Sequence, residues 1–137
     1  MPTSEQEKLP PGRCRQVSLF EMVFPQQTNH YGTLFGGEAL ALMDKAAFIV
    51  ASRYCRRTVV TASSERIDFA APVHQGQLVE LDAQIVATGR TSMIVEVELW
   101  AEELLTGERS LATRGRLVMV ALDGDGKPTA VPAMTAS

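Results

Sequence analysis

A run of seventeen residues, 38–54, contains neither glycine nor proline and is rich in alanine, leucine and methionine. These residue types favour the helical state, so the run predicts one long helix of about 25 Å. On a helical wheel, only the sector that holds Glu38, Lys45 and Ser52 is consistently polar. A helix with so little polar surface is buried on most of its sides in a folded domain. The rest of the chain must therefore supply a cover for it.

Segments typical of β-strands lie on both sides of this helix. A short strand is predicted at residues 16–24, where Pro25 stops it. Its buried face is left open between two alternating series, Val17 with Leu19 and Phe20 with Met22 and Phe24. Four further strands are predicted after the helix, at residues 58–69, 77–88, 91–105 and 108–122. The third of these alternates clearly, with Met93, Val95, Val97 and Leu99 on one face and Glu96 and Glu98 on the other.

The connections between the last four strands are short and contain turn residues such as Pro72, Gly76, Gly89 and Gly107. Short links imply antiparallel pairing. The prediction is an α+β fold in which a five-stranded antiparallel sheet wraps around one central helix. A length of 137 residues fits a single domain. We assign it to residues 16–132, with tails at residues 1–15 and 133–137.

Composition and charge exclude several classes of function. The net charge is −3, from 13 basic and 16 acidic residues, which argues against nucleic acid as a partner. Most of the basic residues are arginine, so a local site for phosphate stays open. The longest apolar run, residues 46–51, is far too short to cross a membrane. Cys14 and Cys55 have neither the number nor the spacing of a disulfide framework or a zinc site, so we expect a cytoplasmic protein without a metal.

Asp44 is the strongest candidate for chemistry because it lies in the middle of the apolar helix. At 100° per residue it shares its side with Leu40, Ala47 and Phe48. Burial would raise the pKa of such a carboxylate, which suits a general base. The alternative is a surface aspartate at the edge of an exposed strip, and the spacing alone does not separate the two.

The loop before the helix contains Asn29, His30 and Tyr31, and then the pair Gly36 and Gly37. Amides at a helix start lack partners inside the helix and could polarise a carbonyl oxygen. Asn29 could position a water molecule, and His30 could act as an acid or base. The alternative is a simple turn and a flexible joint.

Two basic segments could contact phosphate. Arg53, Arg56 and Arg57 cluster at the end of the helix, where cations also complement the helix dipole. Arg90 is followed by the hydroxyls of Thr91 and Ser92 after Gly89, a combination that could bind phosphate or close a hairpin. The chain has no G-x-S-x-G elbow, no phosphate-binding loop of the G-x-x-x-x-G-K-[ST] type and no G-x-G-x-x-G fingerprint.

The segment from Asn29 to Asp44 reads NHYGTLFGGEALALMD, that is, N-x-x-G-x-x-F-G-G-x-x-L-x-x-M-D. This motif resembles the acyl-CoA thioesterases of the hotdog fold, in particular their bacterial broad-specificity and brain acyl-CoA hydrolase branch. The later segments VVTASSERIDFAAPVHQG and GRTSMIVEVELW fit the same family. The resemblance covers roughly residues 17–132.

The resemblance implies hydrolysis of acyl-CoA to a free fatty acid and coenzyme A. It assigns Asp44 as general base or nucleophile, Asn29 of the opposite subunit as a positioner of the attacking water, and the Gly37 amide as the group that polarises the carbonyl. It assigns Thr61, Arg90, Thr91 and Ser92 to the site wall and the coenzyme A contacts. From the basic cluster at the helix end, we add Arg57 to the expected coenzyme A contacts. Coenzyme A is part of the substrate, so no cofactor is expected. The family implies a homodimer with sheets joined edge to edge, often assembled as a trimer of dimers.

Two other functions are open at this stage. A hotdog domain that binds acyl-CoA without catalysis would keep the arginine contacts, although the presence of Asp44 argues against it. A dehydratase acting on hydroxyacyl carrier protein would need a loop histidine followed by a helix glutamate, which His30 with Asp44 matches poorly. His30 and Tyr31 are larger than we expect in this loop and could narrow the acyl tunnel, so the sequence leaves the chain-length preference undetermined.

Overall fold

The fold was analysed in a computed structural model that describes residues 12–134. One long helix and five strands make up the domain, with a short 3-10 turn before the helix. In chain order the elements are β1 (Gln16–Met22), η1 (Pro25–Gln27), α2 (Gly36–Cys55), β2 (Thr58–Phe69), β3 (Leu78–Thr88), β4 (Ser92–Glu102) and β5 (Arg109–Leu122).

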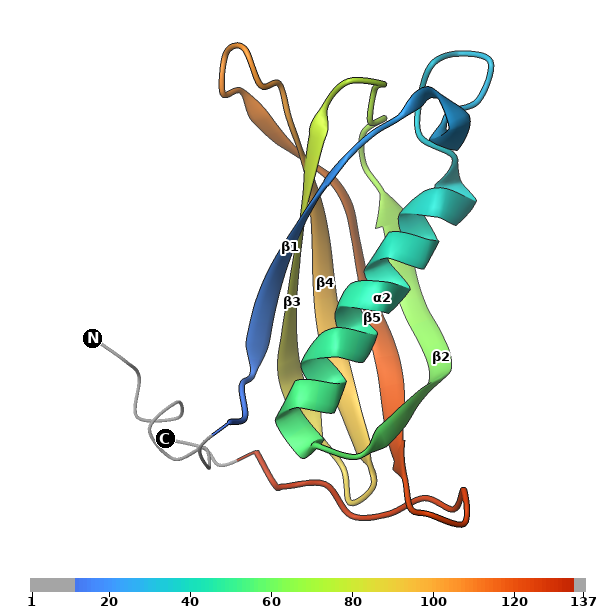
Figure 1. The fold of residues 1–137 in the computed structure, drawn as a ribbon, viewed down its shortest axis with the longest axis vertical. Helices are drawn as coiled ribbons and strands as arrows, with labels where there is room; N and C mark the ends of the chain where they lie inside the picture. The colour runs from blue at the N-terminus through green and yellow to red at the C-terminus, as the bar shows by residue number, and fades with distance from the viewer. Residues whose placement is uncertain (1–11, 135–137) are drawn as a thin grey trace, which may run out of the picture.

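All strand pairs are antiparallel, and the order across the sheet is β1-β3-β4-β5-β2. The helix lies along the concave side of this sheet, with β1 and β2 at its two edges (Figure 1). The predicted α+β fold, a five-stranded antiparallel sheet around one long helix, is therefore confirmed. The sheet has this order because the chain leaves β1, forms the helix and then enters the opposite edge at β2.

The core lies between the inner face of the sheet and one face of α2. Alternate residues of β4 fill it as the sequence pattern predicts, and Met93, Val95, Val97 and Leu99 are fully buried. On the outer face, Glu96 and Glu98 pair across the sheet with Arg116 and Arg114 of β5. In β1 the register left open by the sequence is settled in favour of Val17, which is buried, whereas Phe20 is 58% exposed.

The helix differs from the prediction in two ways. It begins at Gly36, so both glycines of the loop form its first turn. It is also buried on one face only, and a stripe of Leu40, Asp44 and Phe48 stays exposed. The reason is the shape of the sheet, which curves around one side of the helix and stops at β2. The single chain therefore leaves an apolar strip of its central helix uncovered.

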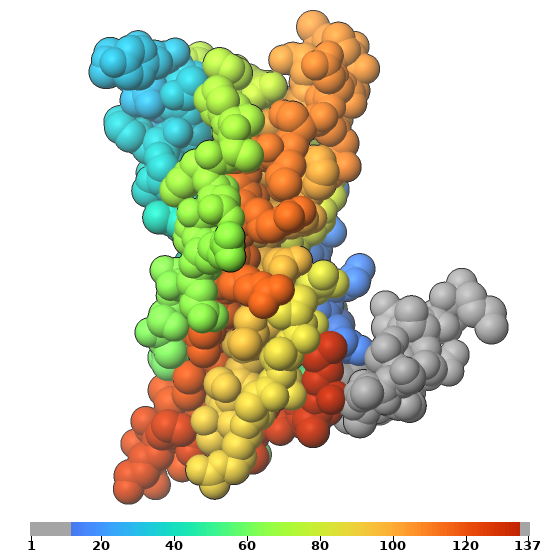
Figure 2. Space-filling view, turned by 180° about the vertical axis from the view of Figure 1, so that it is seen from behind, coloured from blue at the N-terminus to red at the C-terminus, as the bar shows by residue number. Residues whose placement is uncertain are grey.

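The ends of the described chain are bonded to the body of the domain. Within the predicted N-terminal tail, the Cys14 amide donates to the carbonyl of Arg53. After β5 the chain runs back across the end of the sheet, where the Val131 amide donates to the carbonyl of Arg90. Figure 2 shows the outer face of the sheet, with this C-terminal segment in red at one end and the β4–β5 hairpin in orange at the other.

Candidate active site

A pocket of about 280 Å³ opens between the exposed stripe of α2 and strand β2. Its lining combines a carboxylate with aliphatic side chains, and the residues are Leu40, Met43, Asp44, Thr61, Ala62, Ser63, Ser64, Ile67 and Leu117. This mixture of a few polar groups and an apolar wall is typical of a small-molecule site.

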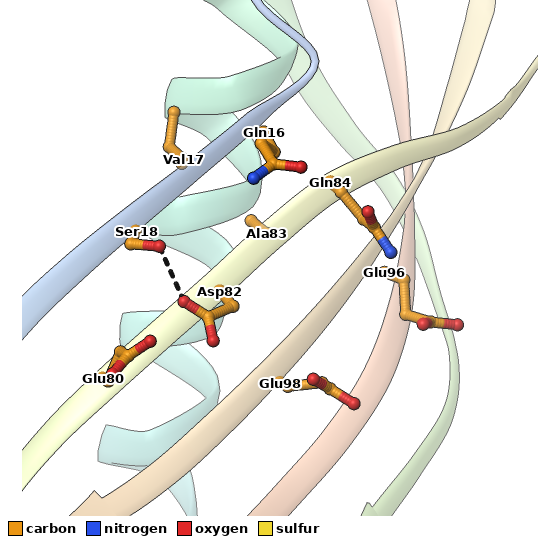
Figure 3. Close-up of a pocket in the computed structure, with 9 residues that line it drawn as sticks. All are labelled: Gln16, Val17, Ser18, Glu80, Asp82, Ala83, Gln84, Glu96 and Glu98. Carbon is orange, nitrogen blue, oxygen red and sulfur yellow. Dashed lines mark hydrogen bonds between the residues drawn. The ribbon is translucent and has the colours of Figure 1, made fainter. Parts of the chain in front are cut away.

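The largest hollows of the outer face have a different character. One is lined by the carboxylates of Glu80, Asp82, Glu96 and Glu98, where Ser18 donates a hydrogen bond of 2.7 Å to Asp82 (Figure 3). Burial, followed by the neighbouring Asp82, raises the pKa of Glu80 above its ordinary value. An acidic surface of this kind offers no wall to an apolar ligand, so the pocket at Asp44 is the candidate active site.

Asp44 stands at the mouth of its pocket and is held from the neighbouring strand. The hydroxyl of Thr61 on β2 donates a hydrogen bond of 2.6 Å to Asp44 Oδ1. Of the two alternatives that the sequence leaves open, the single chain shows the exposed aspartate, because Asp44 lies on the uncovered stripe of α2. The pocket is therefore open to solvent beside Asp44, where a second protein surface could cover it.

Gly37 lies on the same side of α2 as Asp44, since residues seven positions apart share a helix face. About 10 Å of helix axis separates the two. The first amide bonded within the helix is that of Ala39, which donates to the carbonyl of Phe35 at 3.0 Å. The amides of Gly36 and Gly37 precede it and so have no acceptor inside the helix. Gly37 is exposed, and a Cβ placed on it would meet no atom within 4 Å, so a ligand can approach.

Asn29 is half-buried in the loop before the helix and lies outside the set of residues that line the Asp44 pocket. Its side-chain oxygen accepts hydrogen bonds from the amides of Tyr31 and Thr33, and its carbonyl accepts one from Gly32, at φ +78°. The turn that the sequence offered as an alternative is therefore formed. His30 and Tyr31 stack on each other at the exposed tip of this loop, also outside the pocket.

The predicted coenzyme A contacts lie at the other end of the molecule. Arg57 is exposed just after α2, and Arg90 is exposed in the turn between β3 and β4. Both segments are at the end of the domain opposite to the start of the helix (Figure 1). Thr91 and Ser92 are half-buried, and the carbonyls of Thr91 and Ser92 accept backbone bonds from Ala121 and Gly89. Of the predicted wall residues, only Thr61 lines the Asp44 pocket within the single chain.

Several wall residues were not predicted from the sequence. Ser63 and Ser64 are among them, and they line the pocket beside Thr61. The signal is the run TASS within β2, in which three of the four residues are small and carry a hydroxyl. Ile67 and Leu117 carried no signal, because their place in the wall depends on how β2 pairs with β5.

Comparison with known proteins points to one family. Residues 31–108 match the model of the thioesterase superfamily. The chain is 46% identical to the uncharacterized acyl-CoA thioester hydrolase YkhA of Bacillus subtilis, over 87% of this chain and 70% of that protein. It is 33% identical to the acyl-CoA thioester hydrolase YciA of Salmonella typhimurium, over 85% of this chain and 90% of that protein.

Solved structures agree with these relatives. An acyl-CoA hydrolase from Staphylococcus aureus, determined in complex with butyryl coenzyme A, coenzyme A and coenzyme A disulfide, superposes with a TM-score of 0.84 at 35% identity, over 89% of this chain and 74% of that one. Variants of the same enzyme with one aspartate, threonine or asparagine replaced by alanine match equally well. A hexameric acyl-CoA thioesterase reaches 0.86 at 42% identity, over 89% of this chain and 78% of that one.

Within residues 12–134, no helix is long and apolar enough to cross a membrane. The family model spans more than half of the chain, and the sheet order and central helix match those of the solved acyl-CoA hydrolases. The predicted resemblance is confirmed: the chain belongs to the thioesterase superfamily, and its relatives are acyl-CoA thioester hydrolases with the same fold.

Proposed function

We propose that this protein hydrolyses acyl-CoA, with Asp44 as the catalytic carboxylate. One observation carries the proposal: a carboxylate oriented by Thr61 lines a pocket whose wall is largely apolar. The named relatives and the coenzyme A complexes of the staphylococcal enzyme support this choice of substrate. In that enzyme, an aspartate, a threonine and an asparagine have each been replaced by alanine.

The chemistry needs few groups. In one route, Asp44 accepts a proton from a water molecule while the water oxygen attacks the thioester carbonyl. In the other, the Asp44 carboxylate attacks the carbonyl directly, and water then hydrolyses the resulting anhydride. A Gly37 amide donates to the carbonyl oxygen, where negative charge develops. Because about 10 Å of helix axis separates Gly37 from Asp44 in one chain, the amide and the carboxylate that act on one carbonyl come from different chains of the dimer proposed below. The carbon–sulfur bond then breaks, and the thiolate of coenzyme A leaves without an acid, because thiols ionise near neutral pH. The products are a fatty acid and coenzyme A, and no further cofactor takes part.

The phosphates of coenzyme A require cations at the edge of the site. We assign this role to Arg57 and Arg90, with the hydroxyls of Thr91 and Ser92 beside them, because guanidinium groups bind phosphate in a bidentate manner. Both arginines are exposed.

We further propose that the active unit is a homodimer. Leu40 and Phe48 are 39% and 47% exposed on either side of Asp44 along α2, so the single chain leaves an apolar strip that a second chain would cover. Burial against a partner would also shield the site from bulk solvent. In this arrangement Asn29 reaches the pocket from the opposite subunit. A hexameric relative supports further assembly to a trimer of dimers.

We place the protein in the cytoplasm. Cys14 and Cys55 are both free thiols, in keeping with a reducing compartment.

The proposal is tested by a thiol-release assay over straight-chain acyl-CoAs from acetyl to palmitoyl, with binding measured in parallel. Release that saturates with substrate concentration is the expected result. Saturable binding of acyl-CoA without release at any chain length would instead establish a binding domain and refute the hydrolase.

A further inference from the structure

Part of the wall of the Asp44 pocket is built from aliphatic side chains. Asp44 and Thr61 mark where the thioester carbonyl reacts, and the apolar part of the lining is Leu40, Met43, Ile67 and Leu117. An acyl chain leaving that carbonyl contacts this wall, because the other side chains of the lining are small or carry hydroxyls. The depth of the pocket is thus set by which of these side chains closes it.

Ile67 reaches the pocket through an irregularity in β2. Glu65 pairs with Arg116 and Asp68 pairs with Arg114, so two residues of β2 face the single residue Gly115 of β5. This is a β-bulge, and it bends the strand locally. Within it, Arg66 adopts φ +48°, a backbone conformation that is unfavourable for a residue with a Cβ. The bulge turns Arg66 to the outer face, where it lines a pocket with Glu65, and turns Ile67 towards the helix.

The side chain of Ile67 packs directly against the backbone of Gly115. A Cβ on Gly115 would overlap Ile67 Cδ1 and would lie 3.3 Å from Met43 Cε. Only a residue without a side chain leaves room for Ile67 against the sheet. Gly115 pairs with Val97 of β4, so its backbone is held in place by the sheet. Any atom added there must push Ile67 away from the sheet and towards the pocket.

We propose that Ile67 determines the length of acyl chain that the protein accepts. The β2 bulge packs this side chain against Gly115, which fixes its position in the pocket wall. The proposal rests on the hydrolase function above and concerns the same pocket. Removing atoms from Ile67 deepens the pocket, whereas adding a methyl group at Gly115 makes it shallower. The two substitutions therefore act on chain length in opposite directions through one contact.

The test compares kcat/KM over acyl-CoAs from acetyl to palmitoyl for the wild type, Ile67→Ala, Ile67→Val and Gly115→Ala. Each methylene newly accommodated raises kcat/KM by about fourfold. Ile67→Ala is expected to move the optimum to chains about two carbons longer, with a gain of about fifteenfold for them. Ile67→Val moves it in the same direction by less, and Gly115→Ala moves it to shorter chains. In the double variant Ile67→Ala with Gly115→Ala, the added methyl group occupies part of the freed space and restores part of the wild-type profile.

Ile49→Ala is the matched control, because Ile49 is also partly buried against the core but lies outside the pocket lining. It is expected to lower the melting temperature and to keep the wild-type profile. If the wild type hydrolyses acyl-CoA and all the Ile67 and Gly115 variants share its profile, the role of Ile67 is refuted while the hydrolase stands. If the wild type releases no thiol at any length, the proposed function falls, and the assignment of Ile67 falls with it.

Discussion

The Thr61 hydroxyl on β2 donates a 2.6 Å hydrogen bond to Asp44 Oδ1 on α2, so one strand and one helix jointly orient the carboxylate. In the proposed mechanism, the second oxygen of Asp44 accepts a proton from water or attacks the thioester carbon. A charged acceptor makes this a strong hydrogen bond, and its loss lets the carboxylate rotate. Thr61 is in this sense a positioning residue for Asp44.

Thr61→Ala is expected to lower kcat by about ten- to hundredfold, the effect of losing a hydrogen bond to a charged group. Thr61→Ser keeps the hydroxyl and should retain most of the activity. The thiol-release assay measures kcat, and the affinity for coenzyme A provides the structural control, since neither variant removes a phosphate contact. Equal loss in both variants would show that the methyl group, and not the hydrogen bond, matters.

In the proposed dimer, each active site combines Asn29 of one chain with Asp44 of the other. Two variants that are each inactive should therefore complement each other. Asn29→Ala and Asp44→Ala should each be nearly inactive alone. After subunit exchange, random pairing restores about a quarter of the sites, because each mixed dimer has one intact site. Activity is followed as the two preparations are mixed, and exchange is confirmed with differently tagged chains. Complete exchange without recovered activity would place both residues in a site within one chain.

Tyr54 ties the C-terminal segment to the helix. Its hydroxyl donates a 2.8 Å hydrogen bond to the carbonyl of Pro132, and burial raises the pKa of this phenol. Tyr54→Phe leaves that carbonyl without its donor and is expected to lower the free energy of unfolding by about 1 kcal/mol. Urea denaturation measures the change. Tyr31→Phe, at a side chain that is 77% exposed, is the control and should unfold like the wild type.

The raised pKa of Glu80 predicts a pH-dependent stability. Burial is the main cause, Asp82 adds to it, and the Arg109 guanidinium at 3.0 Å offsets part of it. An acid with a raised pKa binds its proton more tightly in the folded state, so stability falls as the pH rises from the ordinary glutamate value through the raised one. Glu80→Gln removes this cost and should melt slightly higher than the wild type at neutral pH. The difference should vanish below the ordinary glutamate pKa.

Thermal melts across this pH range test the prediction. Glu98→Gln is a suitable control because it removes a carboxylate paired with Arg114 at 2.6 Å, and it should give no gain at neutral pH. A Glu80→Gln variant that melts lower than the wild type at neutral pH would mean that the Arg109 ion pair outweighs burial.

Much of the fold follows from local pattern. The helix and the alternation of β4 are visible in the sequence because their side chains repeat with the periods of a helix and a strand. The motif from Asn29 to Asp44 also identifies the candidate carboxylate. These features are carried by neighbouring residues and need no knowledge of the distant parts of the chain.

What the sequence did not reveal depends on distant parts of the chain. The exposure of Asp44 results from a sheet that stops at β2, and no local pattern reports where a sheet ends. The bulge at Arg66 and the packing of Ile67 against Gly115 arise from pairing between β2 and β5. The docked C-terminal segment is held by backbone bonds to Arg90 and Ala121, to which side-chain identity contributes little.

Asp44→Asn tests the central claim most directly, because it removes the charge and keeps the shape of the side chain. Loss of a general base predicts a fall in kcat of about a hundredfold or more, with the affinity for coenzyme A nearly unchanged. Asp82→Asn, on the outer face, should leave thiol release at the wild-type rate. Undiminished hydrolysis by Asp44→Asn at any acyl length would contradict the assignment of Asp44 as the catalytic carboxylate.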